Sequence, residues 1–128
     1  MTYIWVLYIR FIYMRPKRSV SPQIKRGSAE LAVLAVLADA PLHGYEIAKR
    51  IREQTGGAVT FDVAALYPVL YGMEKRRWVE AAWEETPGGR RRRCYRLTAD
   101  GRRRLTPLRR EWRQFFEALN RLARLSDA

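Results

Sequence analysis

The sequence predicts a mainly α-helical domain that carries one small β-hairpin. Between residues 28 and 77, apolar residues recur at helical spacing in three segments. Between residues 78 and 98, two stretches of alternating polarity flank a Thr-Pro-Gly-Gly turn. After residue 98, apolar residues three and four apart predict one more helix, long and narrowly amphipathic.

The first two predicted helices build the core of the domain. Ser28 can cap a helix that runs through AELAVLAVLAD to Asp39, and this helix is apolar almost all round. Such a composition is typical of a central helix that is covered on several sides. A second helix is expected from about His43 to Gln54, with its cations turned outward and a pair of glycines ending it.

The third predicted helix, residues 62–77, has an unusual outward face. Asp62 is its expected N-cap, and at about 100° per residue its large aliphatic side chains gather on one side. The other side combines small residues with tyrosine hydroxyls and a lysine: Ala64, Ala65, Tyr67, Pro68, Tyr71, Gly72 and Lys75. A solvated face would carry more Glu, Lys and Gln, so this face is predicted to contact a partner. Pro68 lies past the first turn and is expected to strain the helix.

The hairpin carries a run of four arginines. Residues 78–83 are predicted to form one strand and residues 94–98 its return. The run lies at the tip and on the returning arm: Arg90, Arg91, Arg92 and Arg93. Adjacent cations repel one another, which indicates an anionic partner. Because neighbouring side chains of a strand point to opposite faces, about half of the four are expected to contact it.

Three helices followed by a basic hairpin are the arrangement of a winged helix-turn-helix. The 128 residues have a net charge of +12, from 25 Lys and Arg against 13 Asp and Glu, a balance typical of nucleic-acid-binding domains. We therefore predict double-stranded DNA as the partner, with a pseudo-palindromic operator if the protein is a dimer. The expected contacts are Ala64, Ala65, Tyr67, Pro68, Tyr71 and Lys75 on the third helix and Arg90, Arg91, Arg92 and Arg93 on the wing. None of the helix residues is a bidentate base reader, so phosphate binding is expected of them.

The last predicted helix is capped by Thr98 and carries an apolar seam. Its members are spaced 3, 4, 3, 4 and 3 residues apart: Leu105, Leu108, Trp112, Phe115, Leu119 and Leu122. Such a narrow seam on a helix of about 25 residues predicts a homodimer interface, because the helix outreaches so small a core. Two alternatives stay open: Leu105 and Leu108 can pack on their own domain, and Trp112, Phe115 and Phe116 can line a pocket for a small aromatic effector.

The sparse histidine and cysteine content argues against an enzyme and against a metal site. One cysteine, Cys94, allows no internal disulfide, and with one histidine, His43, there is no Cys/His zinc set, so neither metal nor cofactor is expected. A reducing, cytoplasmic setting is expected. Four further residues are interpreted as structural. Tyr45 and Tyr95 are expected to place their rings in the hydrophobic core and their hydroxyls at the edge of that core. Gly44 is expected to allow close packing at the start of the second helix, and Glu74 to form an ion pair.

The first 26 residues differ from the rest of the chain. An apolar, aromatic stretch precedes a basic arm, and Arg10 interrupts the stretch. It is shorter than the roughly 20 residues of a membrane span, so no stable membrane insertion is expected. Three interpretations remain: a true start at Met14, an extra element packed on the dimer, or a membrane-surface anchor. The DNA-binding domain is expected over residues 27–98 and the dimerisation helix over residues 99–128.

Three motifs in combination resemble the PadR family of bacterial transcriptional regulators. They are PLHGYEI opening the second helix, LYP followed six residues after Pro68 by Glu74, and R-Y-RLT-x-x-G at the end of the wing. The resemblance implies a homodimeric winged-helix repressor of the short subclass, some of whose members respond to drug-like or phenolic compounds. Ala65 stands where the family commonly has Ser or Thr, so one phosphate-contacting hydroxyl is missing.

Two other classes of protein remain as alternatives to a sequence-specific regulator. A basic protein that coats nucleic acid without sequence preference would bind through phosphate contacts alone, with a steep dependence on salt. A membrane-surface protein would use residues 1–26 and the cationic faces. The ordered third helix argues against both.

Overall fold

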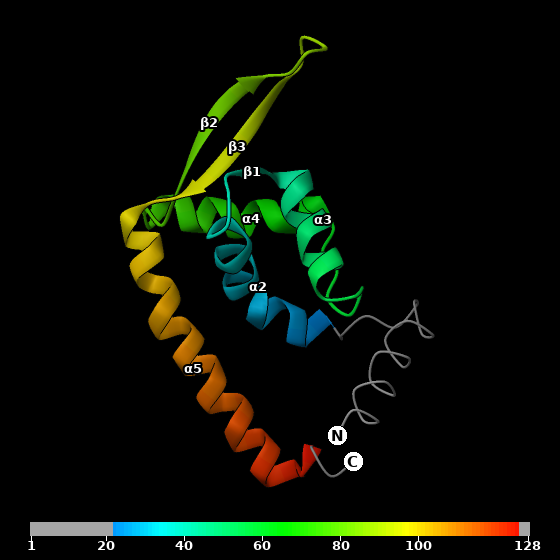
Figure 1. The fold of residues 1–128 in the computed structure, drawn as a ribbon, viewed down its shortest axis with the longest axis vertical. Helices are drawn as coiled ribbons and strands as arrows, with labels where there is room; N and C mark the ends of the chain where they lie inside the picture. The colour runs from blue at the N-terminus through cyan, green and yellow to red at the C-terminus, as the bar shows by residue number, and fades with distance from the viewer. Residues whose placement is uncertain (1–21, 126–128) are drawn as a thin grey trace.

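Residues 22–125 are described by the computed structural model, which gives four helices and a three-stranded antiparallel sheet for this part of the chain (Figure 1). In chain order the elements are α2 (Pro22–Leu37), β1 (Leu42–His43), α3 (Gly44–Gln54), α4 (Val63–Lys75), β2 (Val79–Glu85), β3 (Arg91–Leu97) and α5 (Ala99–Ala123). The predicted fold class, mainly helical with a small hairpin, is confirmed. The interpretations that concern residues 1–21 lie outside the described residues.

The hydrophobic core lies where the first three helices meet the base of the sheet. Val33, Leu34 and Leu37 of α2 are buried, as the all-round apolar pattern predicts. They pack with Ile47 and Ile51 of α3 and with the inward side chains of α4, which are Leu66, Leu70 and Met73. This packing leaves the opposite side of α4 free for another contact.

The beginning of α2 differs from the prediction. The helix starts at Pro22, six positions before Ser28, so Ser28 is not its N-cap and part of the expected basic arm is helical. Proline is well suited to the first position of a helix, where its missing N–H is not needed. The start of α3 is as expected within one residue, but His43 also belongs to the two-residue strand β1, which was not predicted.

The hairpin has an inner and an outer face. In the antiparallel pairing of β2 and β3, Val79 lies opposite Leu97 and Ala81 opposite Tyr95. These pairs close the core, since Val79, Tyr95 and Leu97 are buried. The alternate pairs of the outer face are Glu80 with Arg96, Ala82 with Cys94 and Glu84 with Arg92. Strand β1 borders β3 on its other side and places His43 opposite Cys94.

The tip of the hairpin closes through backbone hydrogen bonds. The N–H of Thr86 donates to the carbonyl of Arg90 at 2.8 Å, and the N–H of Gly89 donates to the carbonyl of Thr86 at 2.9 Å. Gly89 has a φ of 79°, in the left-handed region that favours glycine. The turn chemistry expected of this segment is therefore present, and the hairpin extends away from the helices (Figure 1).

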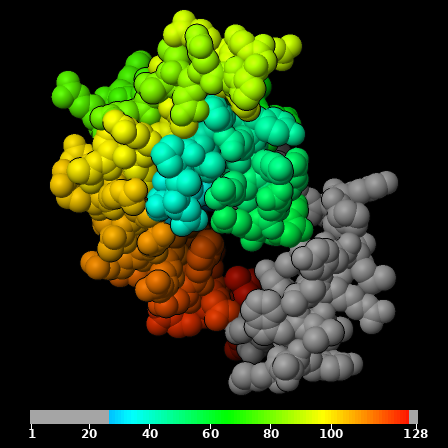
Figure 2. Space-filling model, turned by 45° about the horizontal axis from the view of Figure 1, so that its top comes forward, coloured from blue at the N-terminus to red at the C-terminus, as the bar shows by residue number. Residues whose placement is uncertain are grey.

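Helix α5 leaves the base of the wing and runs past the core. Thr98 caps it as predicted, accepting a hydrogen bond from the N–H of Gly101 at 3.0 Å. The wing forms one end of the molecule, and the last turns of α5 lie at the other (Figure 2). Within residues 22–125, no helix combines the length and the apolar character needed to cross a bilayer.

Candidate nucleic-acid interface

The exposed face of α4 carries the side chains that the sequence singled out. Ala64, Ala65, Pro68 and Lys75 are exposed, while the side chains of Tyr67 and Tyr71 are 39% and 52% exposed. Because Leu66, Leu70 and Met73 anchor the opposite side, α4 cannot turn this face into the core. Small side chains flank the tyrosines, so a second backbone can approach the helix closely.

Helix α3 supports this face through a glycine. The ring of Tyr67 lies so close to the start of α3 that a Cβ atom at Gly44 would be in van der Waals contact with it, at 3.4 Å. This is the close packing predicted for Gly44. The prediction for Tyr45 was wrong: its side chain is 65% exposed. Position 45 falls on the outward face of α3 with Lys49 and Arg52, a relation that the 100° spacing could have revealed.

Arg93 connects the wing to α4. Its guanidinium donates to Glu74 Oε2 at 3.1 Å, which is the ion pair predicted for Glu74. The guanidinium carbon also lies 5.8 to 6.0 Å from the ring centres of Tyr71, Trp83 and Tyr95. Burial works against the charge, but Glu74 and the nearby phenols outweigh it and raise the pKa of Arg93.

Tyr95 lies beneath Arg93 and is fully buried, as a core role predicts. Its hydroxyl is not at the edge of the core, however: the oxygen is buried and has no hydrogen-bond partner within the described part of the chain. Burial raises the pKa of the Tyr95 hydroxyl, so the side chain remains neutral.

The other three arginines of the wing are exposed. Arg91 lies on the inner face of the hairpin, with its guanidinium 5.5 Å from the ring of Trp83, and Arg92 points to the outer face. The alternation of neighbouring arginines between the two faces is therefore as predicted. Arg90 follows the turn at the tip.

A surface hollow of about 390 Å³ lies between α3, α4 and the wing. Its lining combines residues from all three: His43, Gly44, Tyr45, Tyr67, Tyr71, Trp83, Arg91, Arg92, Arg93 and Tyr95. Cationic and hydroxyl-bearing side chains thus share one concave surface with aromatic rings. Tyr45 and Trp83 were not among the predicted contacts, although an exposed aromatic residue beside an arginine run is a recognisable signal.

The outer face of the hairpin holds a second group of polar side chains. Both ring nitrogens of His43 face carboxylates: Nδ1 contacts Glu46, and Nε2 lies 3.1 Å from Glu84 Oε2. The hydrogen bonds from His43 lower the pKa of Glu46. Burial and the neighbouring Glu84 raise the pKa of the Cys94 thiol, which is half-buried.

The apolar seam of α5 divides into two parts. Leu105 and Leu108 are buried in the core of their own domain, the alternative that the sequence left open. Trp112 packs at the edge of that core, with Phe115 and Phe116 at ring-centre distances of 5.8 and 5.6 Å. The two phenylalanine side chains are 51% and 55% exposed, and the side chain of Leu122 is 83% exposed.

The family model described as transcriptional regulator PadR-like family matches residues 33–107. The chain belongs to this family. The PadR-like chain is 30% identical over 101 residues to uncharacterized protein X of Lysinibacillus sphaericus, covering 79% of this chain and 93% of the relative. It is also similar to the solved structure of a transcriptional regulator from Clostridium thermocellum, with a TM-score of 0.72 and 26% identity, over 80% of this chain and 96% of the other.

A PadR family transcription regulator from Clostridium difficile gives a TM-score of 0.65 at 26% identity, over 75% of this chain and 98% of the other. The PadR-like chain is therefore a transcriptional regulator of the DNA-binding, winged-helix type and not an enzyme.

Proposed function

We propose that this PadR-like regulator is a homodimeric repressor that binds a pseudo-palindromic operator. The observation that carries the proposal is the shared hollow, in which the exposed tyrosines of α4 and the arginines of the wing face the same space. In a helix-turn-helix dimer, each recognition helix enters the major groove, and the two half-sites lie about one helical turn apart. Helix α4 takes that role, and the protein acts in the cytoplasm.

The two halves of this surface contribute differently to DNA binding. Tyr67, Tyr71 and Lys75 contact phosphates, because a hydroxyl or an ammonium group donates to one oxygen without distinguishing base pairs. The small side chains at Ala64, Ala65 and Pro68 let the helix approach the DNA. Arg90, Arg91 and Arg92 reach toward the minor groove, which is narrow and strongly negative in A·T-rich sequence. Arg93 is held by Glu74 and positions the wing.

The partner helix of the dimer covers the outer half of the α5 seam. Trp112 packs at the edge of the core that covers Leu105 and Leu108. Phe115, Leu119 and Leu122 continue the same stripe beyond it. An apolar stripe of this kind on one helix is matched by the same stripe on a second copy, as in an isologous interface.

Replacing Leu119 with aspartate is expected to convert the dimer to a monomer. A charge placed at the centre of an apolar helix interface remains unpaired in both copies and costs several kcal/mol. Sedimentation at micromolar concentration should give half the wild-type mass. Gln114→Asp, on the opposite side of α5, is the matched control and should leave the dimer intact. A dimeric Leu119→Asp protein would place the interface elsewhere.

The aromatic cluster of α5 also provides the binding site for an effector. Trp112, Phe115 and Phe116 present three rings near the proposed dimer axis, where a planar aromatic compound can stack. Such a compound releases the operator if it binds better to a dimer whose two DNA-binding heads are at a non-binding angle.

Titration with planar aromatic compounds is expected to quench the fluorescence of Trp112. The Trp112→Ala protein should lose that quenching while it keeps the signal of the other tryptophans. Quenching that persists unchanged in Trp112→Ala would exclude this pocket.

Selection of random duplex DNA by the purified protein tests the proposed function as a whole. At about 0.15 M salt, we expect enrichment of an A·T-rich inverted repeat. Tight binding without enrichment would contradict sequence-specific regulation and would favour a protein that coats DNA through its phosphates.

A further inference from the structure

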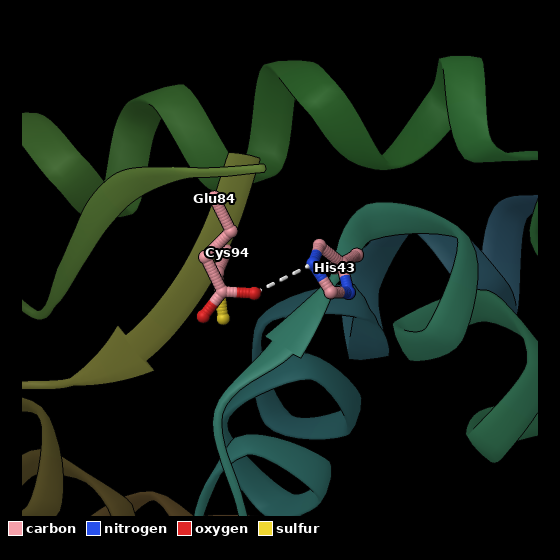
Figure 3. Close-up of side chains that lie close together, drawn as sticks. All are labelled: His43, Glu84 and Cys94. Carbon is pink, nitrogen blue, oxygen red and sulfur yellow. Dashed lines mark hydrogen bonds and ion pairs between the residues drawn. The ribbon is translucent and has the colours of Figure 1, made fainter. Parts of the chain in front are cut away.

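The only histidine and the only cysteine of the chain lie together on the outer face of the sheet. His43 ends β1, Glu84 belongs to β2 and Cys94 belongs to β3. One ligand atom from each lies within 4.8 Å of the other two, and His43 Nε2 is 3.1 Å from Glu84 Oε2. The carboxylate and the thiol are gathered beside the imidazole ring (Figure 3). Three strands thus bring a nitrogen, an oxygen and a sulfur donor to one point.

We propose that His43, Glu84 and Cys94 bind a divalent, thiophilic metal ion, for which Zn²⁺ is the best match. Imidazole nitrogen, thiolate sulfur and carboxylate oxygen are the three donors that zinc takes from proteins, whereas Mg²⁺ and Ca²⁺ take oxygen. Around a tetrahedral zinc ion, neighbouring donor atoms lie about 3.5 Å apart. The pairing of β1 and β3 fixes His43 opposite Cys94, and the three donor atoms lie within 4.8 Å of one another, about an ångström more than this spacing.

The surroundings of His43 already provide the outer shell that such a site needs. The Glu46 carboxylate contacts Nδ1 of His43, which leaves Nε2 of the same ring directed at Glu84 and Cys94. A carboxylate on the second ring nitrogen is the usual partner of a metal-bound histidine, because it fixes the tautomer and the orientation of the ring. A metal ion bound at Nε2 would take the place of the present contact between Nε2 and the Glu84 carboxylate, with both groups as its ligands.

The charges of the donors suit a divalent ion despite the basic character of the whole chain. The Glu84 carboxylate and the Cys94 thiolate together balance the two positive charges of the ion. Nearby Arg96 is engaged by Glu80, with its Nε and one terminal nitrogen 3.0 and 2.9 Å from the same carboxylate oxygen. Arg92, which flanks Cys94 on its other side and lies opposite Glu84, is a second cation on this face.

There is also room for a fourth ligand. A cavity of about 420 Å³ adjoins the cluster, with Glu84 and Cys94 in its lining together with Pro41, Ala82 and Arg96. A water molecule from this side can complete the tetrahedron, the arrangement of zinc sites that keep one open position. Since His43 also caps α3, the ion would join the wing to the first helix of the helix-turn-helix pair.

Titration of the tag-free, reduced protein with Co²⁺ tests the site, because cobalt substitutes for zinc and reports on sulfur ligation. We expect one Co²⁺ per protomer, a near-ultraviolet charge-transfer band from the Cys94 thiolate, and complete displacement by Zn²⁺. We also expect Zn²⁺ to raise the melting temperature, because it binds the folded state. A thiol assay shows whether Cys94 is reduced and available to bind the ion. If it is available and the charge-transfer band is still absent, the proposal is overturned.

Three variants separate this site from adventitious binding. Cys94→Ser should remove the band, and Glu84→Gln should weaken Co²⁺ binding at least tenfold. The matched control is Glu85→Gln, which removes the same charge from the neighbouring exposed position of β2, on the opposite face of the strand, and should bind like the wild type. Equal weakening by Glu85→Gln and Glu84→Gln would mean nonspecific attraction of the ion and would overturn the site. None of these readouts depends on DNA binding, so the result is independent of the proposed operator.

Discussion

Replacing Gly101 with alanine is expected to destabilise the fold by about 3 kcal/mol. Gly101 is buried in the first turn of α5, and a Cβ there would lie 2.1 Å from the carbonyl oxygen of Trp78. That oxygen cannot easily move, because it accepts hydrogen bonds from the N–H of Thr98 at 3.0 Å and from its hydroxyl at 3.1 Å. The clash would therefore separate α5 from the end of α4 and the wing.

Urea denaturation measures this effect. The midpoint for Gly101→Ala should fall by about 2 M, with little change in the slope m. The matched control is Gly72→Ala, a helical glycine of α4 at which an added Cβ meets nothing within 4 Å. It should gain up to about 1 kcal/mol from helix propensity. If both substitutions had the same effect, the contact with Trp78 would not be what requires glycine at position 101.

The features that were predictable from the sequence depend on neighbours close along the chain. Thr98 caps α5 because its hydroxyl reaches an N–H three residues later, and the Pro-Gly-Gly turn closes the hairpin through local bonds. The exposed side of α4 follows from the angular positions of its residues, which place Leu66, Leu70 and Met73 on the buried side. These are short-range relations, and periodicity is sufficient to detect them.

The features that were not predictable depend on residues brought together by the fold. Counting one histidine and one cysteine argued against a metal site, but positions 43, 84 and 94 meet only when β1 joins the hairpin. Strand β1 itself has two residues, too few for an alternating pattern. Similarly, nothing local distinguishes Arg93 from the other wing arginines; its role comes from Glu74 and the three rings around it.

The double replacement Arg91→Ala and Arg92→Ala is expected to reduce the affinity for DNA by about 10- to 100-fold. Both residues line the hollow that α4 shares with the wing, and neither side chain is buried. Each arginine that contacts phosphate releases a counterion, so the slope of log affinity against log salt should become shallower by up to about 2. Fluorescence anisotropy of a labelled A·T-rich duplex at several salt concentrations measures both quantities.

The matched control for the wing is Arg109→Ala with Arg110→Ala, which removes the same charge from exposed positions of α5. An equal loss of affinity in both double variants would mean that net charge alone governs binding.

The wing also makes a second prediction, because arginine in a narrow minor groove reads DNA shape. Exchanging the A·T pairs beneath the wing for G·C should strongly reduce the affinity of the wild-type protein for DNA. The same exchange should have little effect on the affinity of the variant that carries Arg91→Ala and Arg92→Ala. This non-additivity would identify Arg91 and Arg92 as the residues through which the regulator recognises A·T-rich DNA.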